Sequence, residues 1–214
     1  MPRIFVPLVL VALLAGCASA DSPQSHAQQM ASLGDKLRLG GYTIFLRHAH
    51  TDAGTDSDLR NLNNCTTQRN LSAKGREQAK QIGESLRGAS IGVGAVRSSP
   101  FCRTMETARL AMNRASQLRD LMYSPDMKPA EREENVKALT KLLARLPPPG
   151  LNSLLVGHSP PIEAALKDVG PKGVPDKPYI DEGEAVVVQA TEHGFRFVSF
   201  IRIADWPLLA ARPK

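Results

Sequence analysis

Short apolar runs alternate along the chain with longer segments in which apolar residues recur at every third or fourth position. The runs have the length and composition of buried strands and cover residues 42–46, 91–96 and 153–156. The periodic segments predict helices over residues 72–88, 101–113, 130–146 and 160–169. Strands and helices in alternation are typical of a mainly parallel sheet covered on both faces. The pattern therefore predicts an α/β fold, a three-layer α/β/α sandwich.

Three segments depart from this alternation. Residues 185–189 and 195–203 predict two strands joined by a tight turn, so we expect the sheet to gain one or two antiparallel strands. Residues 51–70 are rich in Asp, Asn and Thr and predict a long loop, of a length that is often functional. Residues 117–123 fit either a strand or a loop.

The first residues have the pattern of an export signal. Arg3 precedes an apolar stretch over residues 4–15, which is too short to span a bilayer comfortably. The stretch ends in Leu14-Ala15-Gly16-Cys17, which resembles the cleavage site of bacterial lipoproteins. We therefore predict a signal peptide over residues 1–16 and lipidation of Cys17.

A second cleavage site overlaps the first. Ala18-Ser19-Ala20 fits an ordinary export signal, and cleavage after Ala20 would release a soluble periplasmic protein. The lipoprotein alternative is favoured because small residues directly precede Cys17. It predicts attachment through an N-terminal lipid to the periplasmic face of a bacterial membrane, with the outer membrane preferred.

The polar segment that follows predicts a tether over residues 17–39, with an irregular or partly helical lead-in to the domain, because it shows little apolar periodicity. Residues 40–214 then form one domain, and no internal repeat or second linker divides them. The net charge of +6 suits an anionic ligand only weakly. No basic run with interleaved aromatic residues occurs, so no nucleic-acid partner is expected, and the oligomeric state stays open.

The ends of the predicted strands carry residues suited to phosphate. Arg47 and His48 follow the first strand, Arg103 lies one turn into the helix after the second, and His158 follows the third. Ligands of such sheets bind at the carboxyl ends of the strands, where helix N-termini also favour anions. A guanidinium matches phosphate oxygens, and an imidazole is a nucleophile near neutral pH. One pocket for a phosphoryl group is predicted.

These residues stand in motifs that resemble those of the histidine phosphatase superfamily, also called the phosphoglycerate mutase-like family. Its Arg-His-x-x-Thr motif is met by Arg47-His48-Ala49-His50-Thr51, and its third motif by Gly157-His158-Ser159. Its second motif, Ser-x-Pro-x-x-Arg-x-x-x-Thr-Ala, is met by residues 98–108. Ala49 departs from the pattern, because glycine is usual there. The resemblance covers residues 42–206 and implies a phosphoglycerate mutase-like fold.

The resemblance implies roles for seven residues. His48 is the nucleophile that forms a phosphohistidine, and the phosphoryl oxygens are bound by Arg47, Arg103 and His158. Three further residues are expected to contact the substrate: Thr51, Arg69 and Ser159. For Arg69 a surface-loop position is an equal alternative, and for Ser159 a plain turn position. No metal and no cofactor are implied.

The group that protonates the leaving oxygen lacks a clear motif. Many family members place a carboxylate between the second and third motifs, where Asp120 is the best candidate. Weaker candidates in the same region are Asp126, Glu131, Glu133 and Glu134. Glu182 and Glu184 precede the strand at residues 185–189, and they start on the catalytic face if that strand is antiparallel. The last alternative is that no carboxylate serves, since a good leaving group needs less acid help.

Two cysteines lie outside the export signal, Cys65 in the long loop and Cys102 beside Arg103. A remaining pair in an exported protein usually bonds, although sequence does not give the geometry. We hypothesise a disulfide that pins the loop onto the second motif.

The sequence thus predicts an exported, metal-independent phosphomonoester hydrolase that works through a phosphohistidine on His48. The chain between Arg103 and His158 is short and leaves little room for a cap, which favours a phosphorylated small molecule or sugar phosphate as substrate. The alternatives are a phosphohistidine-protein phosphatase and a non-catalytic phosphate-binding envelope lipoprotein.

Overall fold

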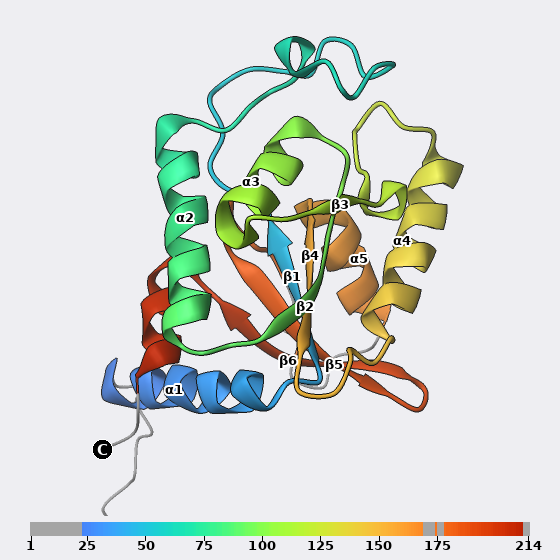
Figure 1. Cartoon of the computed structure of the whole chain (residues 1–214). Coiled ribbons are helices and arrows are strands. Elements are labelled where there is room, and N and C mark those ends of the chain that lie inside the picture. The colour runs from blue at the N-terminus through green and yellow to red at the C-terminus, as the bar shows by residue number, and fades with distance from the viewer. Residues whose placement is uncertain (1–22, 169–173, 175–177, 212–214) are drawn as a thin grey trace, which may run out of the picture.

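The computed structural model describes residues 23–168, 174 and 178–211 (Figure 1). The strands of its sheet are β1 (Tyr42–Arg47), β2 (Val93–Ser98), β3 (Ser116–Gln117), β4 (Asn152–Gly157), β5 (Ala185–Thr191) and β6 (Gly194–Ile201). The α-helices are α1 (Pro23–Leu39), α2 (Ala73–Gly88), α3 (Cys102–Met112), α4 (Pro129–Leu143) and α5 (Ser159–Asp168). Short 3₁₀ segments are η1 (Cys65–Thr67), η2 (Arg119–Leu121) and η3 (Ile203–Ala210).

The sheet has the strand order β3-β2-β4-β1-β5-β6. Strands β3, β2, β4 and β1 are mutually parallel, whereas β5 is antiparallel to both of its neighbours. Ala185, the first residue of β5, therefore pairs with Leu46 near the end of β1, at the edge where the parallel strands finish. The predicted α/β fold with a mainly parallel sheet and an antiparallel addition is confirmed.

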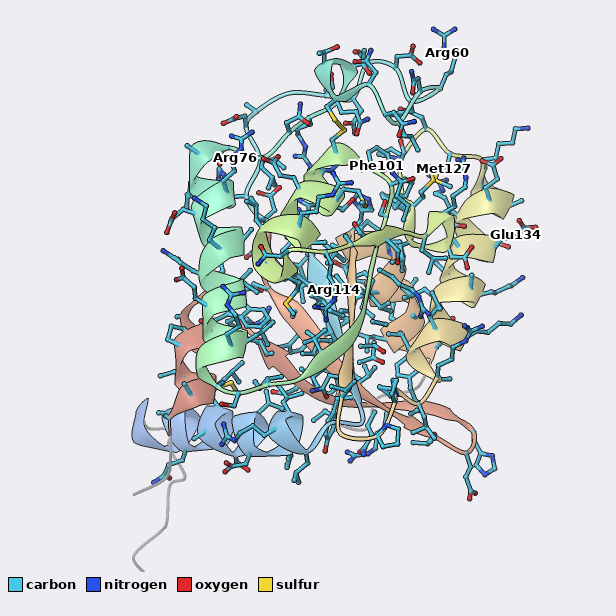
Figure 2. All side chains as sticks on the ribbon, viewed as in Figure 1. Arg60, Arg76, Phe101, Arg114, Met127 and Glu134 are labelled. Atoms are coloured by element: carbon cyan, nitrogen blue, oxygen red, sulfur yellow. A yellow bond between two sulfur atoms is a disulfide. The ribbon has the colours of Figure 1, made fainter. Side chains whose placement is uncertain are left out.

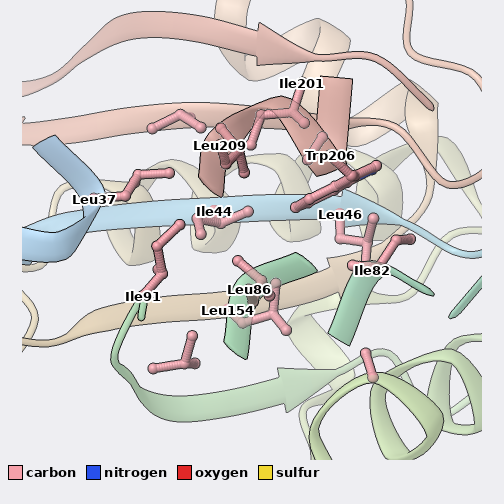
Figure 3. Close-up of a cluster of buried hydrophobic side chains, with 14 of the residues drawn as sticks. Leu37, Ile44, Leu46, Ile82, Leu86, Ile91, Leu154, Ile201, Trp206 and Leu209 are labelled. Atoms are coloured by element: carbon pink, nitrogen blue, oxygen red, sulfur yellow. The ribbon is translucent and has the colours of Figure 1, made fainter. Parts of the chain in front are cut away.

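Two apolar layers separate the sheet from its helices. Successive residues of β1 face opposite sides, so that Ile44 and Leu46 join one cluster and Phe45 the other. The first cluster contains side chains of α1, α2, α3 and η3, and Figure 3 shows its centre around Ile44. The second contains side chains of α4 and α5. Helices therefore cover both faces, as the alternating pattern predicted.

Helix α1 corrects the predicted tether. Residues 23–39 are helical and pack against η3, below the sheet in Figure 1. Met30, Leu33 and Leu37 are buried, and their spacing of three and four residues places them on one face of the helix. The domain therefore begins at α1 rather than at residue 40. Three apolar residues at helical spacing in a polar segment were the signal for it.

The remaining segments agree with the predictions or lie outside them. Residues 51–70 form a loop that contains the single turn η1, and residues 117–123 contain the end of β3 and η2. The predicted signal peptide, Cys17 and the alternative cleavage site at Ala20 lie outside the described residues. Within the described part of the chain, no helix is long and apolar enough to cross a membrane.

Candidate active site

A cavity of about 450 Å³ opens at the edge of the sheet where β1, β2 and β4 end. The loop 51–70 and the segment before α4 stand above this edge, and Figure 2 labels Arg60 on the loop, at the top, and Met127 on the segment before α4, beside Phe101. All four predicted catalytic residues line the cavity: Arg47, His48, Arg103 and His158. The sheet therefore brings together the residues that the three motifs hold far apart in sequence.

The imidazole of His48 is fixed in one tautomer. The backbone N–H of His48 donates to the Gly157 carbonyl (3.1 Å), which continues the pairing of β1 with β4. Its Nδ1 lies 2.9 Å from the Ala49 carbonyl oxygen. Because a carbonyl only accepts hydrogen bonds, Nδ1 carries the proton and Nε2 keeps its lone pair. The ring thus presents Nε2 as the nucleophilic atom.

Burial keeps His48 neutral. The residue is 2% exposed, and this burial lowers its pKa from the ordinary 6.5 to about 3. The bond to the Ala49 carbonyl acts in the opposite direction and raises the pKa, while the charges of Arg103, Arg47 and Arg69 lower it. At neutral pH the free lone pair is therefore available in every molecule.

His158 stands beside His48 at the end of the neighbouring strand. The ring centroids are 5.6 Å apart and the rings meet edge to face, while Nε2 of His158 lies 3.1 Å from the Ser99 hydroxyl. Burial lowers the pKa of His158 well below 6.5, and the charge of Arg103 lowers it further. Two neutral imidazoles thus form the floor of the cavity.

Arg103 also lines the cavity, and one of its donors has no hydrogen-bond partner among the described residues. Its Nη1 donates to Asp56 (2.9 Å) and weakly to the Arg69 carbonyl (3.4 Å), and its guanidinium lies over the ring of Phe101 at 4.4 Å. Its Nε is buried and has no hydrogen-bond partner among the described residues. A buried donor without a partner is costly, so this edge of Arg103 is suited to an anionic oxygen.

Arg47 is held by the segment before β5. Its Nη1 donates to the Tyr179 hydroxyl and the Ile180 carbonyl, both at 2.9 Å. Its backbone N–H donates to the Glu184 carbonyl (3.0 Å), and the Gly183 N–H donates to the His48 carbonyl (3.0 Å). The reversed direction of β5 therefore brings a late part of the chain against the first motif.

Glu182 lies near the arginines of the site, as predicted, but its carboxylate is not placed as expected for the general acid that protonates the leaving oxygen. Its two carboxylate oxygens accept from Thr51, one from the hydroxyl (2.8 Å) and one from the N–H (3.1 Å). Its Oε1 is 3.8 Å from Arg47 Nη2 and 3.9 Å from His48 Nδ1, on the side away from Nε2. Glu182 thus places a negative charge near Arg47, on the Nδ1 side of the His48 ring.

The three predicted substrate contacts have different outcomes. Arg69 lines the cavity, with Nη1 3.9 Å from Glu182. Ser159 also lines it, at the first residue of α5, and its hydroxyl bonds with Glu163. Thr51 is not among the lining residues, and its hydroxyl is engaged by Glu182. Thr51 is therefore corrected from a substrate contact to a residue that holds Glu182.

Two predicted acids lie away from the cavity. Glu184 is buried and accepts from Arg202 (2.6 Å) and from the Asp181 N–H (3.0 Å), so it fixes the segment before β5. Asp120 lies in η2 and is not among the lining residues. Both candidates are corrected, because neither carboxylate lines the cavity.

Two other carboxylates do line the cavity, Asp56 and Asp126. Asp126 is exposed on the segment before α4 and forms no ion pair within the described chain. Asp56 pairs with Arg103 and lines the cavity, and the sequence analysis did not include it among the site residues. It lies in a loop without periodicity, and its only signal was an acidic residue in a long loop after the first motif.

Cys65 and Cys102 form a disulfide in the structure, with Cα atoms 5.7 Å apart. The bond joins η1 to the first residue of α3, next to Arg103. No group of three or more metal-ligating side chains occurs among the described residues.

Comparison with known proteins gives two findings. The family model of the histidine phosphatase superfamily, branch 1, matches residues 43–135, which include the first two motifs. A search of curated proteins found no match.

Solved structures share the fold. The protein histidine phosphatase SixA complexed with tungstate is similar at 20% identity, with a TM-score of 0.52 over 77% of this chain and 98% of that one. A mycobacterial glucosyl-3-phosphoglycerate phosphatase complexed with VO3 is 17% identical, with a TM-score of 0.53 over 74% and 98%. YhfR of Bacillus stearothermophilus is 16% identical, with a TM-score of 0.54 over 73% and 94%.

The family match and the geometry point to the same chemistry. The match covers Arg47, His48 and Arg103, and the fold sets His158 beside them. These findings support a phosphatase, and over residues 43–135 the chain matches the family model of the histidine phosphatase superfamily.

Proposed function

We propose that this protein is an exported, metal-independent phosphomonoester hydrolase that works through a phosphohistidine on His48. The observation that carries the proposal is the pairing of a neutral His48, with its proton held on Nδ1, and the unpaired donor edge of Arg103. The first supplies a nucleophile and the second a site for the phosphoryl oxygens. Both are present before any substrate binds, which is the preorganisation that charge stabilisation requires.

In the first step, Nε2 of His48 attacks phosphorus. An N–P bond forms, the bond from phosphorus to the ester oxygen breaks, and that oxygen takes up a proton to leave as an alcohol. Arg47 and Arg103 stabilise the charge on the remaining phosphoryl oxygens. In the second step, water attacks phosphorus, the N–P bond breaks, and inorganic phosphate leaves with His48 restored.

Asp126 is the proton donor that the geometry favours. Glu182 has both oxygens engaged by Thr51, and Asp56 is bonded to Arg103. Asp126 instead lines the cavity from the facing segment, without an ion pair inside the described chain. General acid help matters most for a poor leaving group. Asp126→Asn is therefore expected to slow glycerol phosphate hydrolysis by about tenfold to a hundredfold and p-nitrophenyl phosphate hydrolysis little.

Asp120→Asn is the matched control for this test. It makes the same change in the same region of the chain, but Asp120 does not line the cavity. Equal losses on both substrates after Asp126→Asn would remove the proton-donor role.

The substrate class we propose is a phosphorylated small molecule or sugar phosphate. A cavity of about 450 Å³ accommodates a small ligand, and loops rather than a separate cap form its walls. The proposed location is the periplasmic face of a membrane, through lipid on Cys17, or the soluble periplasm after cleavage at Ala20. This part of the proposal rests on the sequence of residues 1–20 alone.

The decisive experiment measures p-nitrophenyl phosphate turnover by the mature chain with and without EDTA, beside His48→Ala. We expect turnover that EDTA leaves unchanged and that His48→Ala abolishes. Turnover lost with EDTA would overturn metal independence. Turnover equal in both proteins would favour the alternative of a non-catalytic phosphate-binding lipoprotein.

A second candidate is a phosphohistidine-protein phosphatase, which the shared fold with SixA favours. The same assay on a phosphohistidine-bearing protein and on a sugar phosphate separates the two by their kcat/KM values.

A further inference from the structure

The loop 51–70 is attached to the start of α3 at two points, through Asp56 and through the disulfide. Its first arm contains Asp56, Ser57 and Asp58, and its second arm contains Cys65, Thr67 and Gln68. Hydrogen bonds join the two arms. The Ser57 N–H donates to the Thr67 carbonyl (2.8 Å), and the Thr67 hydroxyl donates to the Asp58 carbonyl (3.0 Å). The two arms are therefore tied to each other by hydrogen bonds.

The second arm is fixed to the start of α3 by two contacts. Cys65 is bonded to Cys102, and the Cys102 N–H donates to the side-chain oxygen of Gln68 (2.9 Å). Gln68 is buried and also donates to the Leu62 carbonyl (2.9 Å), so it ties the arm to the loop tip. This arm therefore has a covalent and a polar attachment at the residue before Arg103.

The first arm delivers Asp56 to the next residue of the same helix. Oδ1 of Asp56 accepts from Arg103 Nη1 and from the Arg69 N–H, both at 2.9 Å. Its side chain is 16% exposed and that of Arg103 is 5% exposed, so this ion pair is largely shielded from water. Each arm therefore ends on one of two adjacent residues, Cys102 or Arg103.

The ion pair between Asp56 and Arg103 does not occupy every donor of the guanidinium. Asp56 takes Nη1, and the Phe101 ring covers one face of the guanidinium, whereas the buried Nε is without a partner in the described chain. The stem of an arginine side chain has rotatable bonds, whereas its guanidinium is planar and rigid, so holding one edge fixes where the other edge points.

We propose that Asp56 is a positioning residue, which the Cys65–Cys102 disulfide keeps in place, and that it aims Arg103 at the phosphoryl group. The inference deepens the proposed function and rests on it for the catalytic consequence. Phosphate binding, however, tests it even if the protein turns out to be a binding module. It also implies that the site is complete only when the disulfide is formed, as in an oxidising compartment.

The opposing expectation comes from charge alone. Removing a carboxylate from an anion site should strengthen phosphate binding, because a repulsion is lost. If Asp56 positions Arg103, removing its carboxylate should instead weaken phosphate binding, since Arg103 then loses its fixed direction. The sign of the change in phosphate affinity therefore separates positioning from charge repulsion.

The test uses the full mature chain and inorganic phosphate, with binding measured by calorimetry. We expect Asp56→Asn to weaken phosphate about tenfold and to lower kcat for p-nitrophenyl phosphate by a similar factor, and Asp56→Glu to restore part of each. Asp58→Asn is the matched control, because Asp58 lies in the same arm but pairs with the exposed Arg60. Tighter phosphate binding by Asp56→Asn, or equal effects of Asp56→Asn and Asp58→Asn, would overturn the proposal.

The disulfide is tested by a double-mutant cycle with Cys65→Ser/Cys102→Ser. Because the bond and Asp56 act on one residue, the two changes are expected to be non-additive in phosphate affinity. A reductant should weaken phosphate binding by the parent chain and leave the Cys65→Ser/Cys102→Ser chain unchanged. Additive effects would show that the disulfide only stabilises the fold. Activity absent from every chain while phosphate binding follows this pattern would reject the proposed hydrolase and keep the role of Asp56.

Discussion

The cavity has two walls of different construction. The strand wall consists of Arg47, His48 and His158, which follow β1 and β4 and are placed by the register of the sheet. The loop wall consists of Asp56, Arg69 and Asp126, which come from the loop 51–70 and the segment before α4. His48 and His158 are buried and neutral, whereas the loop wall carries charges on more exposed side chains. From this difference we infer that nucleophilic attack belongs to the strand wall, whereas the loop wall supplies leaving-group protonation and substrate contacts.

The strongest test of this division is His48→Ala. Without Nε2 no phosphohistidine forms, so kcat for p-nitrophenyl phosphate should fall by about 10⁴-fold or more. Phosphate binding, measured by calorimetry, should change much less because Arg47 and Arg103 remain. A variant that keeps a tenth of the activity would show that His48 is not the nucleophile.

Arg103→Lys probes the residue on which both walls meet. Lysine keeps the charge but lacks the planar fork, so the donor aimed at the phosphoryl group is lost. We expect kcat/KM to fall about a hundredfold, with the fold intact by circular dichroism. A loss below threefold would mean that only the charge of Arg103 matters.

The pH dependence of stability reports on the strand wall. Unfolded His48 takes up a proton below about pH 6.5, whereas the folded protein holds it neutral down to about pH 3. The unfolded state binds more protons between these values, so His48 makes the free energy of unfolding rise with pH across this window and level off above 6.5.

One such group contributes a slope of at most about 1.4 kcal/mol per pH unit. His48→Gln should flatten the slope of urea-unfolding free energy against pH between 4 and 6. Replacement of the exposed His193 by Ala is the control and should leave the slope as it is. An unchanged slope in His48→Gln would contradict the buried neutral imidazole.

The smallest effect is expected in the loop wall. The Arg69 side chain is 31% exposed, so water and salt screen its charge. Arg69→Ala should raise KM for p-nitrophenyl phosphate by about fivefold or less and leave kcat nearly unchanged. The difference from the parent should shrink at high ionic strength. A large loss of kcat would place Arg69 in the chemistry and weaken the division between the walls.

The two walls also differ in how far the sequence predicts them. Arg47, His48 and His158 follow short apolar runs, and the carboxyl ends of parallel strands meet at one edge, so local pattern and topology locate them. The antiparallel direction expected for residues 185–189 likewise brought Glu182 to this edge, although its contacts with Thr51 were not predictable. These inferences need only the direction of each strand.

Contacts that depend on the conformation of a loop could not be predicted from the sequence. Asp56 reaches Arg103 only because the two arms of its loop are bonded, and nothing periodic in residues 51–70 specifies that. Glu184 was expected near the pocket, but Arg202 from beyond β6 takes its carboxylate. A partly helical lead-in was expected before residue 40, but the packing of α1 was not, because its polar residues outweigh the three apolar ones that pack.

The reversed strand β5 sets a limit on how far the chain can be shortened. A fragment that ends after α5 would keep all three sequence motifs and would pass any search for them. It would nevertheless lose the Ile180 carbonyl that holds Arg47, and it would leave one side of β1 without the partner that β5 supplies. An unpaired apolar strand invites association with other chains. For this protein, a complete set of motifs is therefore not a complete site, and minimal versions should retain the final hairpin.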